Sequence, residues 1–503
     1  MAYLVFDLGT SGGKSAVVGK DGRVLASRKE NWAAKMSPAL EAAGREFDSS
    51  EVRSKLIDGA RSALKASGLR PDQVTTISST SIRFGYVFLD KDDNILYFGS
   101  NMDGRGFFEQ GAFVEVAGDQ THEVTGLYPP MLFSIPKLLW FKENAPSVYQ
   151  RVAKIMNVHD WWLYTLSGGF LTDRSSASTT GLFDIKKSRW SQELMGAFGL
   201  DPSLLPEVAE SGKVMGDLSG EFRTQLGLGR AAVVTGGPDT QIGLLGTGCA
   251  VPGETGMVAG ATNPCQQVVD SLPPTLGKKL LVGAYVLPGT FVVEANAGSS
   301  GLVYDWAVKL YAGSADDPYG RAAELISRAP NGPTGIISML GAQIMVSEKI
   351  FVLKPAVSVF PSPMMGGMEL ADPGAFLKGV IEELCYAAAC NLDEVEQYTG
   401  NRAARLKLTG GLVRNKEFLS ILSSTTGKDV LPSLNHDGTM VGVALCCMVG
   451  SGRYPNLLEA CRKTELVGPP VKPAETSQDY QEQKGRWRDL YYKMLALAEE
   501  GAL

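Results

Sequence analysis

Residues 3–19, YLVFDLGTSGGKSAVVG, contain the pattern that decides the fold. The segment is similar to the phosphate-binding P-loop, G-x-x-x-x-G-K-[ST], but only three residues separate Gly9 from Gly13, one too few. It also runs into AVVG, a β-type sequence, whereas a P-loop must open a helix. We therefore predict a buried strand, a glycine-rich turn and a second strand, followed by a tight turn at residues 20–23, KDGR.

Such a hairpin turn can face a phosphate with its backbone N–H groups and with the hydroxyls of Thr10 and Ser11. Lys14 would add positive charge nearby. Asp7, at the end of the first strand, can hold a hydrated Mg²⁺, because this ion prefers one or two carboxylates together with waters and phosphate oxygens. An ordinary hairpin with permissive glycines fits the local pattern equally well, so both interpretations stay open.

A second stretch, TGGPDTQIGLLGTG at residues 235–248, places one carboxylate, Asp239, among glycines and small apolar residues. These neighbours offer little solvation for a charge, which favours a function for the carboxylate. The structural alternative is that Asp239 caps the helix predicted by TQIGLLGTG.

The opening pattern recurs in weaker form after about residue 246. Residues 253–270, GETGMVAGATNPCQQVVD, again predict strand, Gly/Thr turn and strand, and RLKLTGG at 405–411 predicts a strand ending in a glycine turn. A double glycine lets a ligand approach the backbone, and Asn415 can contact a purine edge; a plain loop before a helix fits as well. We expect two α/β domains of similar ancestry, residues 1–246 and 247–503.

Helical spacing of apolar residues predicts helices between these strands. The first would be capped by Ser49 or Ser50. The predicted ranges are 49–68, 131–146, 155–168, 373–400 and 415–427.

Arg83, at a strand end, and Asp103 with Arg105 form a plausible polar set for a small hydroxylated ligand. Each of them, taken alone, is more often a surface salt-bridge residue. The three histidines are too scattered for a metal site, and His159–Asp160 before WWLYTLSG is typical of helix packing.

Composition limits the class of protein. A chain of 503 residues needs more than one core, and a net charge of −6 argues against a nucleic-acid partner. The start has no basic leader, and the longest apolar run is about half of the ~20 residues that span a bilayer. Seven cysteines without a C-x-x-C pair predict free thiols in a reducing compartment. We expect a cytoplasmic protein without membrane contact; its oligomeric state stays open, with a homodimer as one option.

The ordered set YLVFDLGTSGGK, FSIPKLLWFKEN, GGPDTQIGLLGTG, AGATN and LTGGLVRNKEFLSILSSTTG resembles the FGGY carbohydrate kinases. The resemblance extends from about residue 3 to 490. It implies an α/β fold with two actin/hexokinase (ribonuclease H-like) domains and a central ATP/sugar cleft. TSIRFG, NMDGR, TTGLFDI and AAACNLDEVE are most similar to the autoinducer-2 kinases, whereas the first turn is also close to that of xylulokinases.

The resemblance assigns roles position by position. Asp239 would be the catalytic base, which accepts the proton of the substrate hydroxyl, and would also contact the substrate and Mg²⁺. Asp7 would help place Mg²⁺, and Arg83 and Asp103 would contact the sugar. The ATP-binding positions would be Gly9, Thr10, Ser11, Lys14, Gly260, Thr262, Gly410, Gly411 and Asn415.

Three positions depart from the family pattern. Ala261 lacks the hydroxyl that is common in the second turn, Phe84 stands where related kinases have an acid, and Asp437 stands where many members have Glu. The resemblance implies an ATP- and Mg²⁺-dependent kinase of a small sugar or polyol, with an autoinducer-2-like substrate. The alternatives are a ketopentose kinase and a non-catalytic sugar or nucleotide sensor of the same fold.

Overall fold

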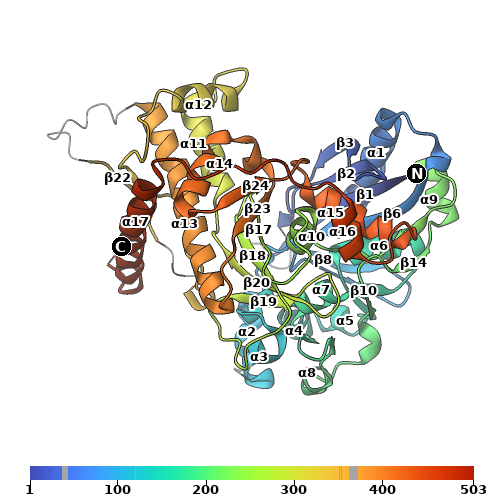
Figure 1. Cartoon of the computed structure of the whole chain (residues 1–503). Coiled ribbons are helices and arrows are strands. Elements are labelled where there is room, and N and C mark those ends of the chain that lie inside the picture. The colour runs from blue at the N-terminus through green and yellow to red at the C-terminus, as the bar shows by residue number, and fades with distance from the viewer. Residues whose placement is uncertain (37–42, 119–120, 350–351, 353, 362–371, 503) are drawn as a thin grey trace. The chain divides into compact units, whose positions relative to one another are not determined.

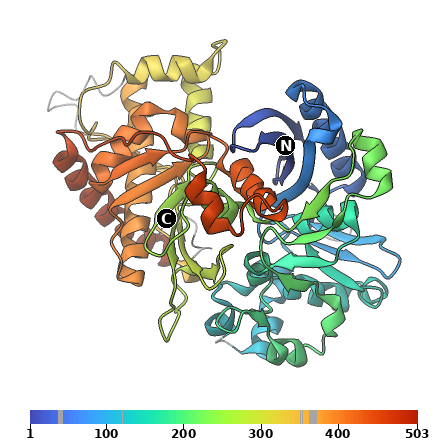
Figure 2. The same cartoon turned by 45° about the vertical axis from the view of Figure 1, so that its right-hand side comes forward.

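The computed structural model describes residues 1–36, 43–118, 121–349, 352, 354–361 and 372–502. The chain forms two compact units (Figure 1 and Figure 2). Unit 1 comprises Met1–Pro252, Val268–Val292 and Asp437–Leu466, and unit 2 comprises Gly253–Gln267, Val293–His436 and Val467–Leu503. Each unit is thus assembled from separate stretches of the chain. The division into family domains at residue 246 stays a prediction.

Unit 1 is built on a sheet with the strand order β14-β15-β6-β1-β2-β3, and β16 pairs with β6 beside this path. β1 and β2 form the predicted antiparallel hairpin, and β1 lies parallel to β6. The chain after the glycine turn is a strand and not a helix, as the failed P-loop match indicated. The strands are β1 Ala2–Leu8, β2 Gly12–Gly19, β3 Val24–Asn31, β6 Val74–Ser81, β14 Val214–Asp217, β15 Ala232–Val234 and β16 Gly237–Pro238.

Helix α1, Ser49–Ser67, packs against β2 and β3 (Figure 1). The cap predicted at Ser49 or Ser50 is wrong, because the side chain of Asp48 accepts from the backbone N–H groups of Ser50 and Glu51. A carboxylate at this position also meets the positive end of the helix dipole. Gly68 ends the helix in the left-handed conformation.

A second sheet of unit 1 contains β7 Tyr86–Leu89, β8 Ile95–Gly99 and β9 Lys154–Asn157. The helix predicted from residue 155 is partly wrong: Ile155 to Asn157 pair with β7, and helix α6, Val158–Ser167, begins only after them. Sheet pairing overrides the helical pattern in these three residues. The other helices of this region include α2 Arg105–Ala117, α4 Ser134–Asn144 and α7 Arg174–Ala177.

Two buried helices complete the core of unit 1 behind the first sheet. Helix α10, Asp239–Gly246, packs along α15, Gly438–Gly450, and α15 also packs on β1 and β6. Their apolar side chains join those of Val5 and Val18 in one cluster. Asp239 therefore begins a helix that is packed tightly against its neighbours.

Unit 2 repeats the motif of unit 1. β17 is antiparallel to β18 and parallel to β23, as β1 is to β2 and β6, which agrees with the predicted repeat. Helices α11, α13 and α14 pack together beside this sheet (Figure 1). The elements that lie wholly or mostly in unit 2 are β17 Thr255–Val258, β18 Pro264–Val269, β20 Phe291–Asn296, β23 Arg405–Thr409, β24 Asp429–Pro432, α11 Gly301–Ala312, α12 Pro318–Ile326, α13 Pro373–Thr399, α14 Lys416–Thr426 and α17 Ser477–Glu499.

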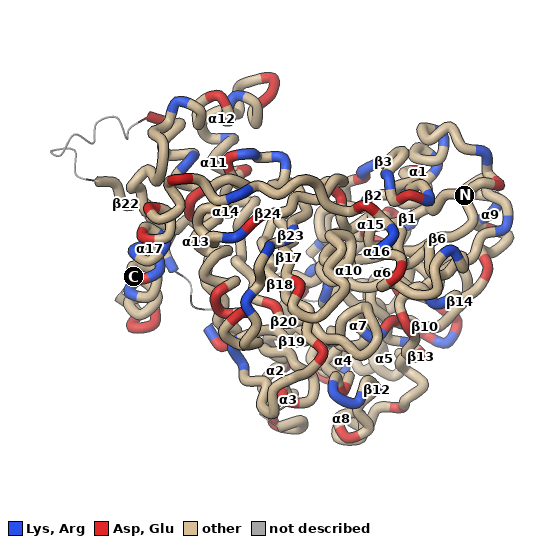
Figure 3. Tube along the Cα trace, viewed as in Figure 1, with Lys and Arg blue, Asp and Glu red and all other residues tan. Residues whose placement is uncertain are grey.

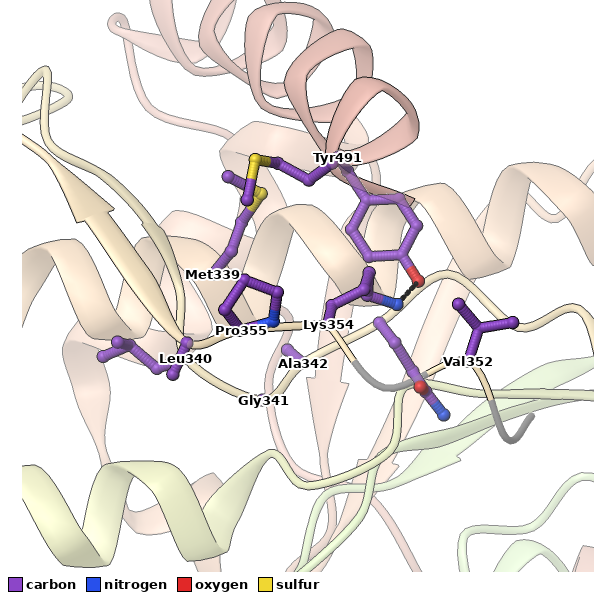
Figure 4. Close-up of a pocket in the computed structure, with 11 residues that line it drawn as sticks. Met339, Leu340, Gly341, Ala342, Val352, Lys354, Pro355 and Tyr491 are labelled. Atoms are coloured by element: carbon purple, nitrogen blue, oxygen red, sulfur yellow. Dashed lines mark hydrogen bonds between the residues drawn. The ribbon is translucent and has the colours of Figure 1, made fainter. Parts of the chain in front are cut away.

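A cavity of about 170 Å³ lies in unit 2 between residues 339–343 and helix α17 (Figure 4). The Lys354 ammonium donates to the Tyr491 hydroxyl over 2.7 Å at its edge. None of the predicted site residues lines this cavity.

Three further features concern the charge distribution, the cysteines and the polarity of the helices. Basic and acidic residues are interspersed along both units (Figure 3), so the net charge of −6 comes from a small excess of acids spread over the chain. All seven cysteines are free and buried, as predicted. Among the described residues, every helix is too short or too polar to cross a bilayer.

Helix α13 buries two neighbouring carboxyls, and this predicts a pH dependence of stability. Glu383 accepts from the N–H groups of residues 340–342 and Glu382 from Thr334, yet burial raises the pKa of both to about 7, from 4.5. A group whose pKa is higher in the folded than in the unfolded protein contributes its full stabilisation at pH values below its unfolded-state pKa. This contribution is lost as the pH rises through its folded-state pKa. We expect the free energy of unfolding to fall between about pH 5 and pH 8.

Urea unfolding at about pH 5 and at about pH 8 measures this change in the free energy of unfolding. Glu383→Gln keeps an oxygen for the three N–H donors but cannot titrate, so its stability should change less with pH. The exposed Glu324, replaced by Gln, is the control and should keep the wild-type slope. An equal slope in Glu383→Gln and the wild type would contradict the assignment.

Candidate functional site

The first turn joins β1 to β2 and is held from several sides. The Gly9 N–H donates to the Gly12 carbonyl over 2.8 Å, and the Trp32 indole donates to the Gly9 carbonyl over 3.1 Å. A Cβ on Gly13 would lie 2.3 Å from the Trp32 ring, so only glycine fits. Thr10 donates to the Asn101 amide over 3.0 Å. Trp32 and Asn101 are supports that the sequence did not reveal.

Carboxylates gather near this turn in unit 1. Burial, together with the negative charges of Asp239 and Asp437, raises the pKa of Asp7 to about 7, against the opposing effect of Lys14. Lys14 forms an ion pair with Asp437, the residue that precedes helix α15. The fold thus brings together residues 7, 14, 239 and 437, of which Asp437 had no predicted role.

Asp239 stands out by its exposure. Every residue from Val233 to Thr247 is buried except Asp239, which is partly exposed. Its Oδ1 accepts from the Thr240 N–H over 2.7 Å at the start of α10. The residue that caps α10 is Pro238, without a side-chain hydrogen bond, and Asp239 is the first residue of the helix, so the interpretation of Asp239 as the cap is wrong. The carboxylate still presents a face to solvent.

This arrangement fits a magnesium ion. The negative charge of Asp239 disfavours the ionised form of Asp7, and a divalent cation would relieve that repulsion. Within the described ranges, no group of three or more His, Cys, Asp or Glu has metal-binding geometry. Mg²⁺ needs only one or two carboxylates when phosphate oxygens and waters supply the rest.

Asp103 is more deeply engaged than a surface residue. Its carboxylate accepts from the Arg45 N–H over 2.8 Å and from both the backbone and the guanidinium of Arg105. Arg105 is 1% exposed and lies against the rings of Tyr97 and Trp140. The surface-salt-bridge alternative is therefore wrong for this pair. A sugar contact by Asp103 stays a prediction, and its present contacts stabilise the turn that leads into α2.

Arg83 lies in the tight turn between β6 and β7. Its guanidinium carbon is 5.6 Å from the centre of the Phe84 ring, within cation–π range. Phe84 is buried and has a φ of 62°, a left-handed conformation that is rare for such a residue. Strained residues of this kind cluster at functional sites, so the turn joins the candidate site.

In unit 2, the second turn, residues 260–262, lies next to the other predicted ATP-binding segment, residues 410–415. The Leu412 N–H donates to the Ala259 carbonyl over 3.1 Å, next to Gly260. Gly260 donates to the Thr262 carbonyl over 3.1 Å, which closes the turn, and Ala261 and Thr262 are exposed. Gly410 has a φ of 106°, which suits glycine, and Gly411 begins the short 3₁₀ helix that follows.

Asn415 ends this segment and holds it to helix α11. Its side-chain oxygen accepts from the Phe418 N–H over 3.1 Å and caps α14, and its amide donates to the Tyr304 hydroxyl over 3.1 Å. The sequence pointed to Asn415 but not to Tyr304, because the two lie 111 positions apart.

Comparisons with known proteins agree with this architecture. The autoinducer-2 kinase of Salmonella typhimurium is 26% identical over 99% of this chain and 95% of its own length. Among solved structures, xylulose kinase from Lactobacillus acidophilus has a TM-score of 0.84 at 16% identity, covering 99% of each chain. Glycerol kinase from Plasmodium falciparum with ADP has a TM-score of 0.82 at 18% identity, covering 98% of each. These structures confirm the predicted actin/hexokinase-type fold.

The sequence also matches the two domains that define one enzyme family. Residues 2–246 match the N-terminal domain of the FGGY family of carbohydrate kinases, and residues 253–451 match its C-terminal domain. Together these ranges cover most of the chain, and the glycine turns and Asp239 lie within them. The chain belongs to the FGGY family of carbohydrate kinases.

Proposed function

We propose that this ATP-dependent kinase phosphorylates a terminal hydroxyl of a short, highly oxygenated open-chain molecule related to autoinducer-2, with Asp239 as the base. The observation that carries the proposal is the position of Asp239: a partly exposed carboxylate in an otherwise buried segment, electrostatically coupled to Asp7. A sugar hydroxyl becomes a good nucleophile only when such a group accepts its proton.

In the proposed reaction, Arg83 and Asp103 orient the substrate, and Asp239 takes the proton as the hydroxyl attacks the γ-phosphorus. The bond between the γ-phosphorus and the bridging oxygen breaks, and ADP leaves. Within unit 1, backbone N–H groups of the first turn and Lys14 would stabilise phosphate charge. Within unit 2, residues 260–262 and 410–415 are the proposed nucleotide-binding positions. Asp7 and Asp239 would hold Mg²⁺, which supplies positive charge to the phosphate oxygens. The free, buried cysteines support a cytoplasmic location.

The runner-up substrate is a ketopentose. It is favoured by the first turn, which resembles that of xylulokinases, and by Phe84, which stands in the sequence where related kinases have an acid. The assay that decides between them compares kcat/KM for the opened signal molecule, D- and L-xylulose, ribulose, erythrulose and glycerol. The proposal expects the opened signal to rank first. Efficient turnover of a ketopentose, with none of the signal, would reverse the ranking.

Phe84 offers a direct test of how hydroxyls are selected. Phe84→Glu places an acceptor beside Arg83 without changing the backbone strain, since both are unbranched at Cβ. A site that hydrogen-bonds a substrate hydroxyl discriminates between substrates far more strongly than an apolar site. We therefore expect the ratio of kcat/KM for glycerol to kcat/KM for the wild type's best substrate to rise by roughly 10-fold in Phe84→Glu.

Phe84→Gly is the matched control, because it removes the ring but adds no acceptor. It should not produce the same change in preference. If both variants shift the preference equally, the ring's bulk and not the missing acid determines selectivity.

A further inference from the structure

A buried set of polar side chains lies behind the strand that leads to Asp239. Its members come from β6, α6 and the segment formed by β10, Leu171–Asp173, and α7 of unit 1, and each is at most 1% exposed. We refer to it as the buried polar ring. It consists of Ser81, His159, Asp173, Ser175 and Ser176.

His159 connects the two halves of the ring. Its Nδ1 lies 3.0 Å from the Ser81 hydroxyl, and its Nε2 lies 3.0 Å from the Ser176 hydroxyl. Ser175 and Ser176 both donate to the Asp173 carboxylate, through hydroxyl and backbone N–H groups. The ring is therefore continuous from β6 to α7.

The donors and acceptors fix the state of the imidazole. The Ser176 hydroxyl donates to Asp173, so it accepts from His159 Nε2–H. Nδ1 is then left to accept from the Ser81 hydroxyl, which can also donate to the Ile82 carbonyl over 3.2 Å. Asp160 Oδ1 lies 3.2 Å from Nε2 but forms no hydrogen bond with it. Burial lowers the pKa of His159 to about 4, in keeping with a neutral ring.

The ring packs against the backbone that carries Asp239. Strand β16, Gly237–Pro238, pairs with Thr80–Ser81 of β6, and Thr80 donates to the Gly237 carbonyl over 2.7 Å. From the other side, a Cβ on Gly237 would lie 3.2 Å from the Ser175 hydroxyl. Ser81 and Ser175, at the two ends of the ring, thus flank the two residues that precede Asp239.

We infer that His159 and Asp173 are positioning residues: through Ser81 and Ser175 they hold Gly237–Pro238 and so aim the Asp239 carboxylate at the substrate hydroxyl. The inference rests on the proposed role of Asp239. The ring itself does not touch the substrate, and its effect passes through the backbone of β16. A displacement of about 1 Å at a reacting group can cost 10²-fold in rate.

The test is a double-mutant cycle. His159→Leu should lower kcat by roughly 10- to 100-fold with little change in KM for ATP. In the Asp239→Asn background the same substitution should cause little further loss, because the group that it misplaces is already inactive. Ser176→Ala, which removes a single oxygen atom, should show the same pattern with a smaller loss and with the fold retained.

Two comparisons separate positioning from general destabilisation. His159→Gln keeps an N–H near the Nε2 position and should recover most of the activity that His159→Leu loses. Asp90→Asn is the matched control: Asp90 is also buried and hydrogen-bonded, but it holds the turn at residues 90–94 and pairs with Arg151. Its kcat should stay close to that of the wild type.

The outcomes are distinguishable. A normal kcat in His159→Leu, or losses that multiply in the Asp239→Asn background, would overturn the positioning role while leaving the kinase mechanism intact. A normal kcat in Asp239→Asn alone would instead overturn the proposed base, and the positioning role with it.

Discussion

Asp239→Asn is expected to lower kcat by roughly 10²–10⁴-fold, the usual range for the loss of a general base. The amide keeps an oxygen for the Thr240 N–H, so the start of α10 and the fold should be preserved. Asparagine cannot accept the substrate's proton, so the loss should appear in turnover. Steady-state kinetics with the best substrate measures it.

Nucleotide binding and thermal unfolding provide the control for this variant. Thermal unfolding, and nucleotide binding measured without Mg²⁺, should be close to those of the wild type, because Asp239 neither fills the core nor forms the glycine turns. Near-normal turnover with the best substrate would mean that another group accepts the proton.

The second large effect is expected at Asp7. Asp7→Asn removes a carboxylate that would hold Mg²⁺, a contribution worth several kcal/mol, so kcat should fall by about 10²-fold or more. The Mg²⁺ concentration for half-maximal activity should rise at the same time. A titration of activity with Mg²⁺ at saturating ATP and substrate measures both effects.

Asp437→Asn is the matched control for Asp7. It removes a nearby negative charge and frees Lys14, but leaves the Asp7 carboxylate in place. Its effect on the Mg²⁺ requirement should be much smaller. Equal requirements in Asp7→Asn and the wild type would rule out Asp7 as a metal ligand.

Features with a local signal could be predicted from the sequence. The β1–β2 hairpin follows from an apolar strand, a glycine turn and a second apolar strand, and the spacing of Gly9 and Gly13 correctly excluded a P-loop. Asp239 was found because a charge among glycines is unusual, and its partly exposed position agrees with that interpretation.

Features made by distant contacts could not be predicted in this way. Lys14 and Asp437 are 423 positions apart, and nothing in either segment indicates the pairing. Asp103 and Arg105 have the charges of surface residues, but three aromatic rings cover the arginine in the fold. His159 was correctly expected to pack within a helix, yet its contacts with Ser81 and Ser176 depend on tertiary structure.

The most direct test of the central claim is to incubate the protein with Mg²⁺, ATP and each candidate substrate, and to measure ADP and the phosphorylated product together by chromatography and mass spectrometry. We predict that at least one short polyhydroxylated substrate gains a single phosphoryl group in a one-to-one ratio with ADP, and that Asp239→Asn loses both products in parallel. ADP release without a phosphorylated product for every substrate in the panel, or product formation that survives Asp239→Asn unchanged, would contradict the account.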